Sequence, residues 1–160
     1  MGQHPGLMNA RDLFGKLERE MLRLEAAASA TPAADRAELS DSYFNFAVTA
    51  HHLGDWIRGD PSVPAAARTA LDDLSSKQAL RVCRDLANGS KHFRDSRQDV
   101  IVADATCTTT WGGGRYGVGP HGVGEPTILV TLADGTVLSG LELAREATRV
   151  WKEFFAAHGL

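Results

Sequence analysis

The sequence predicts a mostly α-helical (α+β) fold: a bundle of four to five helices with a small antiparallel β-meander inserted before the last helix. Apolar residues recur at helical spacing in three long segments, 13–28, 43–57 and 143–154. Residues 99–138 are instead rich in Val, Ile and Thr, and they contain Asp134-Gly135, a favoured hairpin turn. Strands and helices do not alternate, which excludes a doubly wound sheet.

The first two helices are delimited by capping residues and helix breakers. The first is expected to follow Asn9, whose side chain can cap it, and to end before Pro32. The second is expected from about Asp41 to Arg58, with Ser40 as its cap and Gly59 at its end. This second helix is apolar on two sides, which is typical of a helix at the centre of a bundle.

The later elements carry similar signals. A short helix is expected near Pro64, and Ser75 and Gln78 form a capping box for the helix that contains CRDLANGSKHF, residues 83–93. The alternating segment after residue 98 predicts a strand, and TILVTLADGTVLS predicts two strands joined by a two-residue turn. A capping box at Ser139 begins the final helix, which Gly159 closes.

Length and composition indicate one domain over residues 1–160, with 99–138 as the insertion. The chain is 43% hydrophobic and 23% charged, which excludes disordered and fibrous classes. No segment reaches the roughly 18 apolar residues of a membrane span, and the start lacks the pattern of a secretory signal. Together with two widely spaced cysteines, Cys83 and Cys107, this predicts a cytoplasmic protein without disulfides.

Charge is unevenly distributed along the chain. The net charge of −3 argues against a protein that coats nucleic acid, but residues 77–97 hold six basic against two acidic side chains, a local net charge of +4. Such a segment is either an anion or nucleic-acid site or a solvated helix face paired with acidic neighbours.

No metal or cofactor is predicted. The sequence lacks C-x-x-C and H-x-x-x-H, and the adjacent His51 and His52 would point about 100° apart on a helix. The glycine-rich segment 112–124 contains G-x-G-x-x-G, but Pro120 interrupts it and a strand follows, so a strand-connecting loop is the better interpretation.

A polar stripe is the strongest candidate site. At about 100° per residue, one side of the fourth helix carries four polar residues and two basic residues flank them (Arg81, Asp85, Asn88 and His92; Arg84 and Lys91). A histidine can act as general acid or base near neutral pH, and cations can hold a phosphate. These are the groups needed for metal-free RNA cleavage. The alternative is a solvent face with an Arg81–Asp85 salt bridge.

His52 is a second candidate. It shares a helix side with Val48 and Trp56, and Asp55 lies one turn away. It either faces the polar stripe or is a half-buried histidine paired with a carboxylate or backbone group.

The segment RDLANGSKH, residues 84–92, resembles the bacterial HEPN-type helical domains. That resemblance implies a compact α-bundle, often dimeric, and in many members a metal-independent ribonuclease. Arg84 would be the motif arginine, Asp85 its polar neighbour and His92 the motif histidine. Seven residues separate Arg84 from His92, more than in the family pattern, and the inserted strands are a second departure.

The expected function is therefore RNA or nucleotide binding by a homodimeric, HEPN-like domain, with metal-independent ribonuclease activity. The catalytic residues would be Arg84 and His92, and the binding residues Asp85, Asn88, Lys91 and His52. The alternative is a non-catalytic homodimeric interaction module whose polar stripe orders a helix–helix interface.

Overall fold

The computed structural model describes residues 6–30, 35–89, 99–110 and 125–160. Within these ranges the chain forms helices and strands in an order that confirms the predicted fold class. The elements are α1 (Ala10–Ala28), α2 (Arg36–Gly59), α3 (Ala65–Leu74), α4 (Gln78–Gly89), β1 (Val102–Thr110), β2 (Glu125–Leu132), β3 (Val137–Ser139) and α5 (Gly140–His158).

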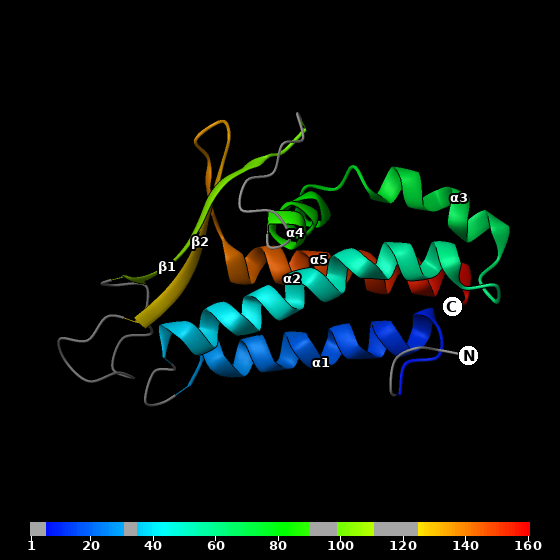
Figure 1. Cartoon of the computed structure of the whole chain (residues 1–160), viewed down its shortest axis with the longest axis horizontal. Coiled ribbons are helices and arrows are strands. Elements are labelled where there is room, and N and C mark those ends of the chain that lie inside the picture. The colour runs from blue at the N-terminus through cyan, green and yellow to red at the C-terminus, as the bar shows by residue number, and fades with distance from the viewer. Residues whose placement is uncertain (1–5, 31–34, 90–98, 111–124) are drawn as a thin grey trace.

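Helix α2 lies at the centre of the bundle, where it packs against α1, α4 and α5 (Figure 1). Its apolar residues therefore point to more than one neighbour, as its two-sided pattern predicted. Phe46 and Leu53 of α2 are fully buried, and so is Leu17 of α1. The sheet lies at one end of the bundle and α3 at the other (Figure 1).

The sheet is antiparallel, with the strand order β1-β2-β3. Alternate residues of β2, namely Ile128, Val130 and Leu132, are buried, and β2 contacts α2 and α5. A bulge interrupts the β1–β2 register between Val102 and Asp104, after which the pairing is regular through Thr110. Period-two alternation thus directs one face of β2 into the core.

The hairpin between β2 and β3 differs from the prediction by one residue. Leu132 and Thr136 are the last bonded pair, with the Leu132 N–H donating to the Thr136 carbonyl at 2.8 Å, so the loop has three residues, 133–135. Gly135 has φ +86°, the left-handed conformation that such a loop requires. Asp134 accepts the N–H of Thr136, which fixes the turn.

Two helix starts also differ from the prediction. Helix α2 begins at Arg36 rather than near Asp41, because the Asp35 side chain accepts the N–H of Ala37 and caps the helix five residues before Ser40. The expected capping box at α4 is replaced by another bond: the Ser75 hydroxyl donates to the carbonyl of Asp72, at the end of α3. The structure describes α4 as far as Gly89, so the rest of the predicted helix, up to Phe93, lies outside the described residues.

At its first residue, Gly140, the backbone of helix α5 lies close to core side chains of β2 and α2. Its N-cap is Ser139, as predicted, with the side chain accepting the N–H of Glu142. A Cβ added at Gly140 would lie 2.5 Å from Cγ2 of Ile128 and 3.1 Å from the Tyr43 ring. Glycine at this position therefore lets α5 start directly against β2 and α2.

Candidate functional site

The predicted site residues fall in different parts of the molecule. Arg84 and Asp85 lie in the middle of α4, and Asn88 lies half-buried in its last turn. His52 lies half-buried on α2. Lys91 and His92 lie outside the described residues.

Asp85 holds the start of β1 against α4. Its carboxylate is 1% exposed. One oxygen accepts the backbone N–H groups of Ile101 at 2.7 Å and Val102 at 3.3 Å, and the other accepts Nε of Arg84 at 3.1 Å. A buried carboxylate is stable only when such donors surround it. The carboxylate that we predicted to bind a ligand therefore also has a structural function.

Arg84 connects this buried carboxylate to the surface. One of its terminal nitrogens lies 2.7 Å from Oδ2 of Asp99, and the other donates to the Asp99 carbonyl at 3.1 Å. Arg81, one turn earlier, donates to the same carbonyl at 3.1 Å. Arg81, Arg84 and Asp85 are thus engaged with residues 99–102, which lead into β1. A quarter of the Arg84 side chain remains exposed.

Arg84 also lines a cleft of about 170 Å³ between four helices. The cleft has a largely apolar floor and a polar rim. We call it the Arg84 cleft, and its lining consists of Ala50, His51, Gly54, Asp55, Arg58, Leu71, Leu74, Ser75, Leu80, Arg84 and Trp151. The bundle therefore brings Arg84 together with residues of α2, α3 and α5 that are distant in sequence.

A hydrogen bond joins two residues in the floor of the Arg84 cleft. Trp151 of α5 is buried, and its indole N–H donates to the carbonyl of Ala50 at 3.1 Å. Gly54 lies beside it, and a Cβ added there would have as its nearest neighbours Nη1 of Arg58 at 3.7 Å and Cη2 of Trp151 at 3.9 Å. A Cβ at position 54 would thus make ordinary van der Waals contacts, and a longer side chain there would compete with a ligand because Gly54 lines the cleft.

The rim carries loosely paired charges. Arg58 lies 3.6 Å from Asp55 and 3.7 Å from Asp72, and all three side chains are at least half exposed. Exposed pairs of this kind contribute about 0–1 kcal/mol each. Arg58 can therefore exchange its carboxylate partners for another anion at little cost.

His51, not His52, is the histidine that lines the Arg84 cleft. The two imidazole rings are neighbours, with centroids 5.6 Å apart. His51, Gly54, Asp55 and Arg58 recur at i, i+3, i+4 and i+7 on α2, which is the spacing of one helix face. This pattern was visible in the sequence and could have identified His51 and Arg58. The contribution of Trp151 could not be seen without the packing of α5.

Neither cysteine forms a disulfide. Cys83 is buried, and burial raises the pKa of its thiol to about 12, so it stays protonated at neutral pH. In the described part of the chain, no group of three or more His, Cys, Asp or Glu side chains is placed to hold a metal ion. Among the same residues, no helix is long and apolar enough to cross a membrane.

No family model, curated protein or solved structure matches this chain. The HEPN-like resemblance of residues 84–92 thus stays a prediction from the sequence.

Proposed function

We propose that this chain is an RNA- or nucleotide-binding helical domain that holds one base or one phosphate in the Arg84 cleft. The observation that carries the proposal is the combination of two guanidinium groups, Arg58 and Arg84, with an apolar floor that includes Trp151. A nucleotide has the complementary chemistry, because its phosphate pairs with arginine and its base offers a flat apolar face.

The size of the cleft favours a ligand that is one part of a single-stranded RNA over a small molecule that the cleft would enclose completely. Its volume of about 170 Å³ lies below the roughly 300–1,000 Å³ of pockets that enclose a drug-sized ligand. One base or phosphate would occupy the cleft while the rest of a single strand lies outside it. The segment 77–97 carries a local net charge of +4 in the sequence, and such a charge would attract the phosphates of that strand.

The two arginines have different functions in this proposal. Arg58 is exposed and loosely paired, so it can turn to a phosphate. Arg84 is tied to Asp85 and Asp99 at 2.7–3.1 Å, so its guanidinium is held in one orientation in the lining of the cleft, where it shares its charge with two carboxylates. A preoriented guanidinium costs little entropy on binding, which is why it suits a phosphate site.

Ribonuclease activity is the further part of the proposal, and it rests on the resemblance of residues 84–92. In metal-free cleavage, the 2′-hydroxyl attacks the adjacent phosphorus, the 5′-oxygen leaves, and a histidine transfers the proton. His92 would supply that proton transfer, and Arg84 would stabilise the charge on the phosphate.

Binding is tested by fluorescence anisotropy of a short labelled single-stranded RNA at low and at physiological salt. We expect salt-sensitive binding that weakens several-fold in Arg58→Gln, because one phosphate contact is lost. Arg149→Gln is the matched control: Arg149 is also exposed and ion-paired, but it lies on α5 outside the Arg84 cleft. Equal weakening in both variants would mean that only the overall charge matters.

Cleavage is tested separately on a mixed RNA pool in EDTA, with His92→Ala as the comparison. Cleavage that disappears in His92→Ala would support the ribonuclease, and cleavage that persists would place the activity elsewhere. If the protein neither binds RNA in a salt-sensitive way nor cleaves it, the proposal is wrong, and the alternative of a protein-interaction module takes its place.

A further inference from the structure

The outer edge of β1, the side away from β2, has no strand partner among the described residues, because the sheet order is β1-β2-β3. The opposite edge is β3, which has three residues and leads directly into α5. Short edge strands are protected from pairing, whereas a long edge strand offers a row of backbone donors and acceptors. With nine residues, β1 is the long edge.

β1 is less buried than its neighbour β2. Ala105 pairs with Val130, so both lie on the face of the sheet that is turned toward the bundle. Val130 is fully buried, yet Ala105 is exposed. Helices α2 and α4 contact β1 as well, and Cys107 packs half-buried against the core, but the exposed Ala105 leaves this part of the β1 edge open to another strand.

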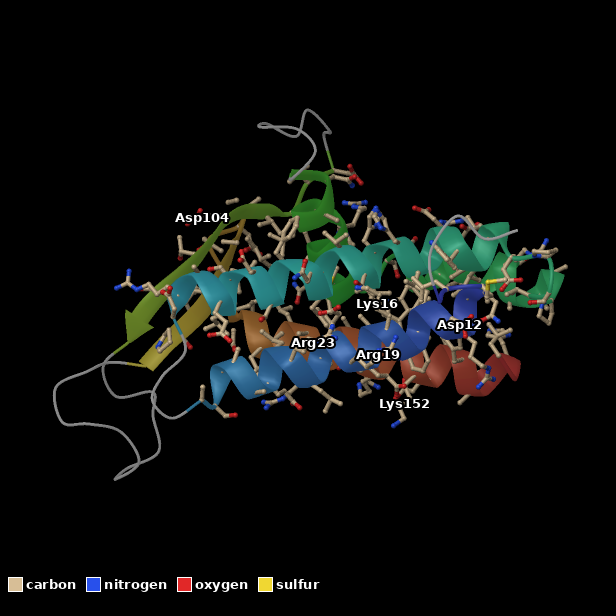
Figure 2. All side chains as sticks on the ribbon, turned by 60° about the horizontal axis from the view of Figure 1, so that its bottom comes forward. Asp12, Lys16, Arg19, Arg23, Asp104 and Lys152 are labelled. Carbon is tan, nitrogen blue, oxygen red and sulfur yellow. The ribbon has the colours of Figure 1, made fainter. Side chains whose placement is uncertain are left out.

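Little in the sequence of β1 prevents such pairing. Native edges are commonly protected by lysine, proline or a bulge. β1 contains neither lysine nor proline, its bulge lies at its first residues, and Asp104 is its one charged residue. Figure 2 shows Asp104 on β1, well apart from the labelled charged residues of α1. The regular segment that follows, residues 105–110, is ATCTTT.

We infer that the β1 edge binds a second copy of this chain, forming an antiparallel pair of β1 strands and a continuous six-stranded sheet. A two-fold axis requires the two identical strands to run antiparallel, which is also the pairing used throughout this sheet. The bulge limits the regular pairing to residues 104–110, whose centre is Cys107. Full use of this segment therefore places Cys107 opposite Cys107 of the second copy.

That register is self-complementary. It places Thr106 opposite Thr108 of the second copy on the face of the sheet away from the helices, and cross-strand threonine pairs are favourable. Asp104 lies opposite position 110, a threonine, so the two carboxylates do not face each other. A partner strand of opposite charge is not needed, because Asp104 is the one charged residue of β1. This inference does not depend on the proposed RNA binding.

The interface is small, so the dimer should dissociate on dilution. Seven residues extend about 24 Å, and an edge pairing of that length buries less than the roughly 1,200 Å² typical of stable complexes. Sedimentation velocity from low to high micromolar concentration should therefore show a monomer–dimer equilibrium. A monomer throughout that range would overturn the inference.

Two double variants test the register. Thr106→Lys with Thr108→Lys places like charges opposite each other at both positions and should abolish the dimer. Thr106→Glu with Thr108→Lys places opposite charges there and should restore it. Thr127→Lys with Thr131→Lys is the matched control on β2, the central strand, and should leave the dimer unchanged. If the first variant dimerises like the unmodified protein, the β1 edge is not the interface.

Cross-linking of the unmodified protein gives a second measurement of the interface. Opposed residues of an antiparallel pair have Cα atoms about 4.5–5.5 Å apart, within the range that a disulfide spans. Mild oxidation with diamide should link two copies through Cys107, and Cys107→Ser should prevent the link. Cys83 is buried and cannot substitute for it. A cross-link that forms equally in Cys107→Ser, or none at concentrations where the dimer sediments, would contradict this register.

Discussion

The carboxylate of Asp85 on α4 accepts the backbone N–H of Ile101, sixteen residues later in the chain, at 2.7 Å. The same oxygen accepts the backbone N–H of Val102, and the other oxygen accepts Nε–H of Arg84. One buried side chain thus fixes both the entry of β1 and the orientation of the arginine that lines the cleft. We therefore regard Asp85 as a structural connection that also positions Arg84.

The first prediction concerns this connection. Asp85→Ala would leave the N–H groups of the half-buried Ile101 and Val102 without this acceptor, at about 1–3 kcal/mol for each donor left unsatisfied. We expect a loss of at least about 2 kcal/mol in urea unfolding. Asp99→Asn, which changes the exposed partner of Arg84, should cost about 0–1 kcal/mol. Equal losses in the two variants would contradict the structural function of Asp85.

The second prediction concerns Glu20, a buried carboxylate on α1. Its Oε1 accepts hydrogen bonds from Nζ of Lys16 at 3.0 Å and from Nη1 of Arg23 at 2.8 Å. Figure 2 labels both of these basic residues. Burial raises its pKa, but the hydrogen bonds and charges of Lys16 and Arg23 outweigh burial and lower the pKa below its ordinary value of 4.5. The contribution of Glu20 to stability is therefore complete above pH 4.5 and is lost as the pH falls through the lowered pKa.

This pH dependence can be measured by following unfolding from pH 7 down through pH 4.5 and below, the direction in which Glu20 becomes protonated. Glu20→Gln should be less stable than the unmodified protein at pH 7, and the difference should shrink as the pH falls. Glu18→Gln, an exposed change on the same helix, should run parallel to the unmodified protein. A constant difference for Glu20→Gln across the range would show that its pKa is not lowered by folding.

The third prediction concerns Gly140 at the start of α5. A Cβ there would lie 2.5 Å from Cγ2 and 2.9 Å from Cβ of Ile128, so backbone or core must shift. Overpacking of this kind costs typically about 1–3 kcal/mol, so Gly140→Ala should be destabilised although alanine favours helices. Gly54→Ala has no such contact and should be stabilised by up to about 1 kcal/mol. Thermal unfolding of the two variants should therefore shift in opposite directions.

Local signals in the sequence were enough to predict most of the fold. Asn9 and Ser139 cap their helices as expected, and the stripe of Leu17 and its neighbours forms the core. The start of α2 was misplaced because two good capping residues, Asp35 and Ser40, flank a segment that favours helix. Residues 36–39 are Arg-Ala-Glu-Leu, so the helix extends to the earlier cap.

The candidate site was less predictable, because its contacts join distant segments. Helical spacing placed Asp85 on the side of Arg81, but it could not show that Ile101 and Asp99 would lie against that side. Only the packing of four helices brings Trp151 beside Gly54 and Arg84. Of the predicted residues, Arg84 lines the cleft, whereas His52 is not among the residues that line it.

The central claim is that the Arg84 cleft binds a nucleotide, and a pair of glycine variants on α2 tests it most directly. Gly54→Leu should fill the cleft beside Trp151, whereas Gly59→Leu adds the same side chain at the end of the helix, where a Cβ has no neighbour within 4 Å. Both changes replace glycine in the same helix, so both proteins should fold. Anisotropy titration with single-stranded RNA should show at least tenfold weaker binding for Gly54→Leu, about 1.4 kcal/mol, and unchanged binding for Gly59→Leu. Unchanged binding by Gly54→Leu would contradict the account, because RNA would then bind outside the Arg84 cleft.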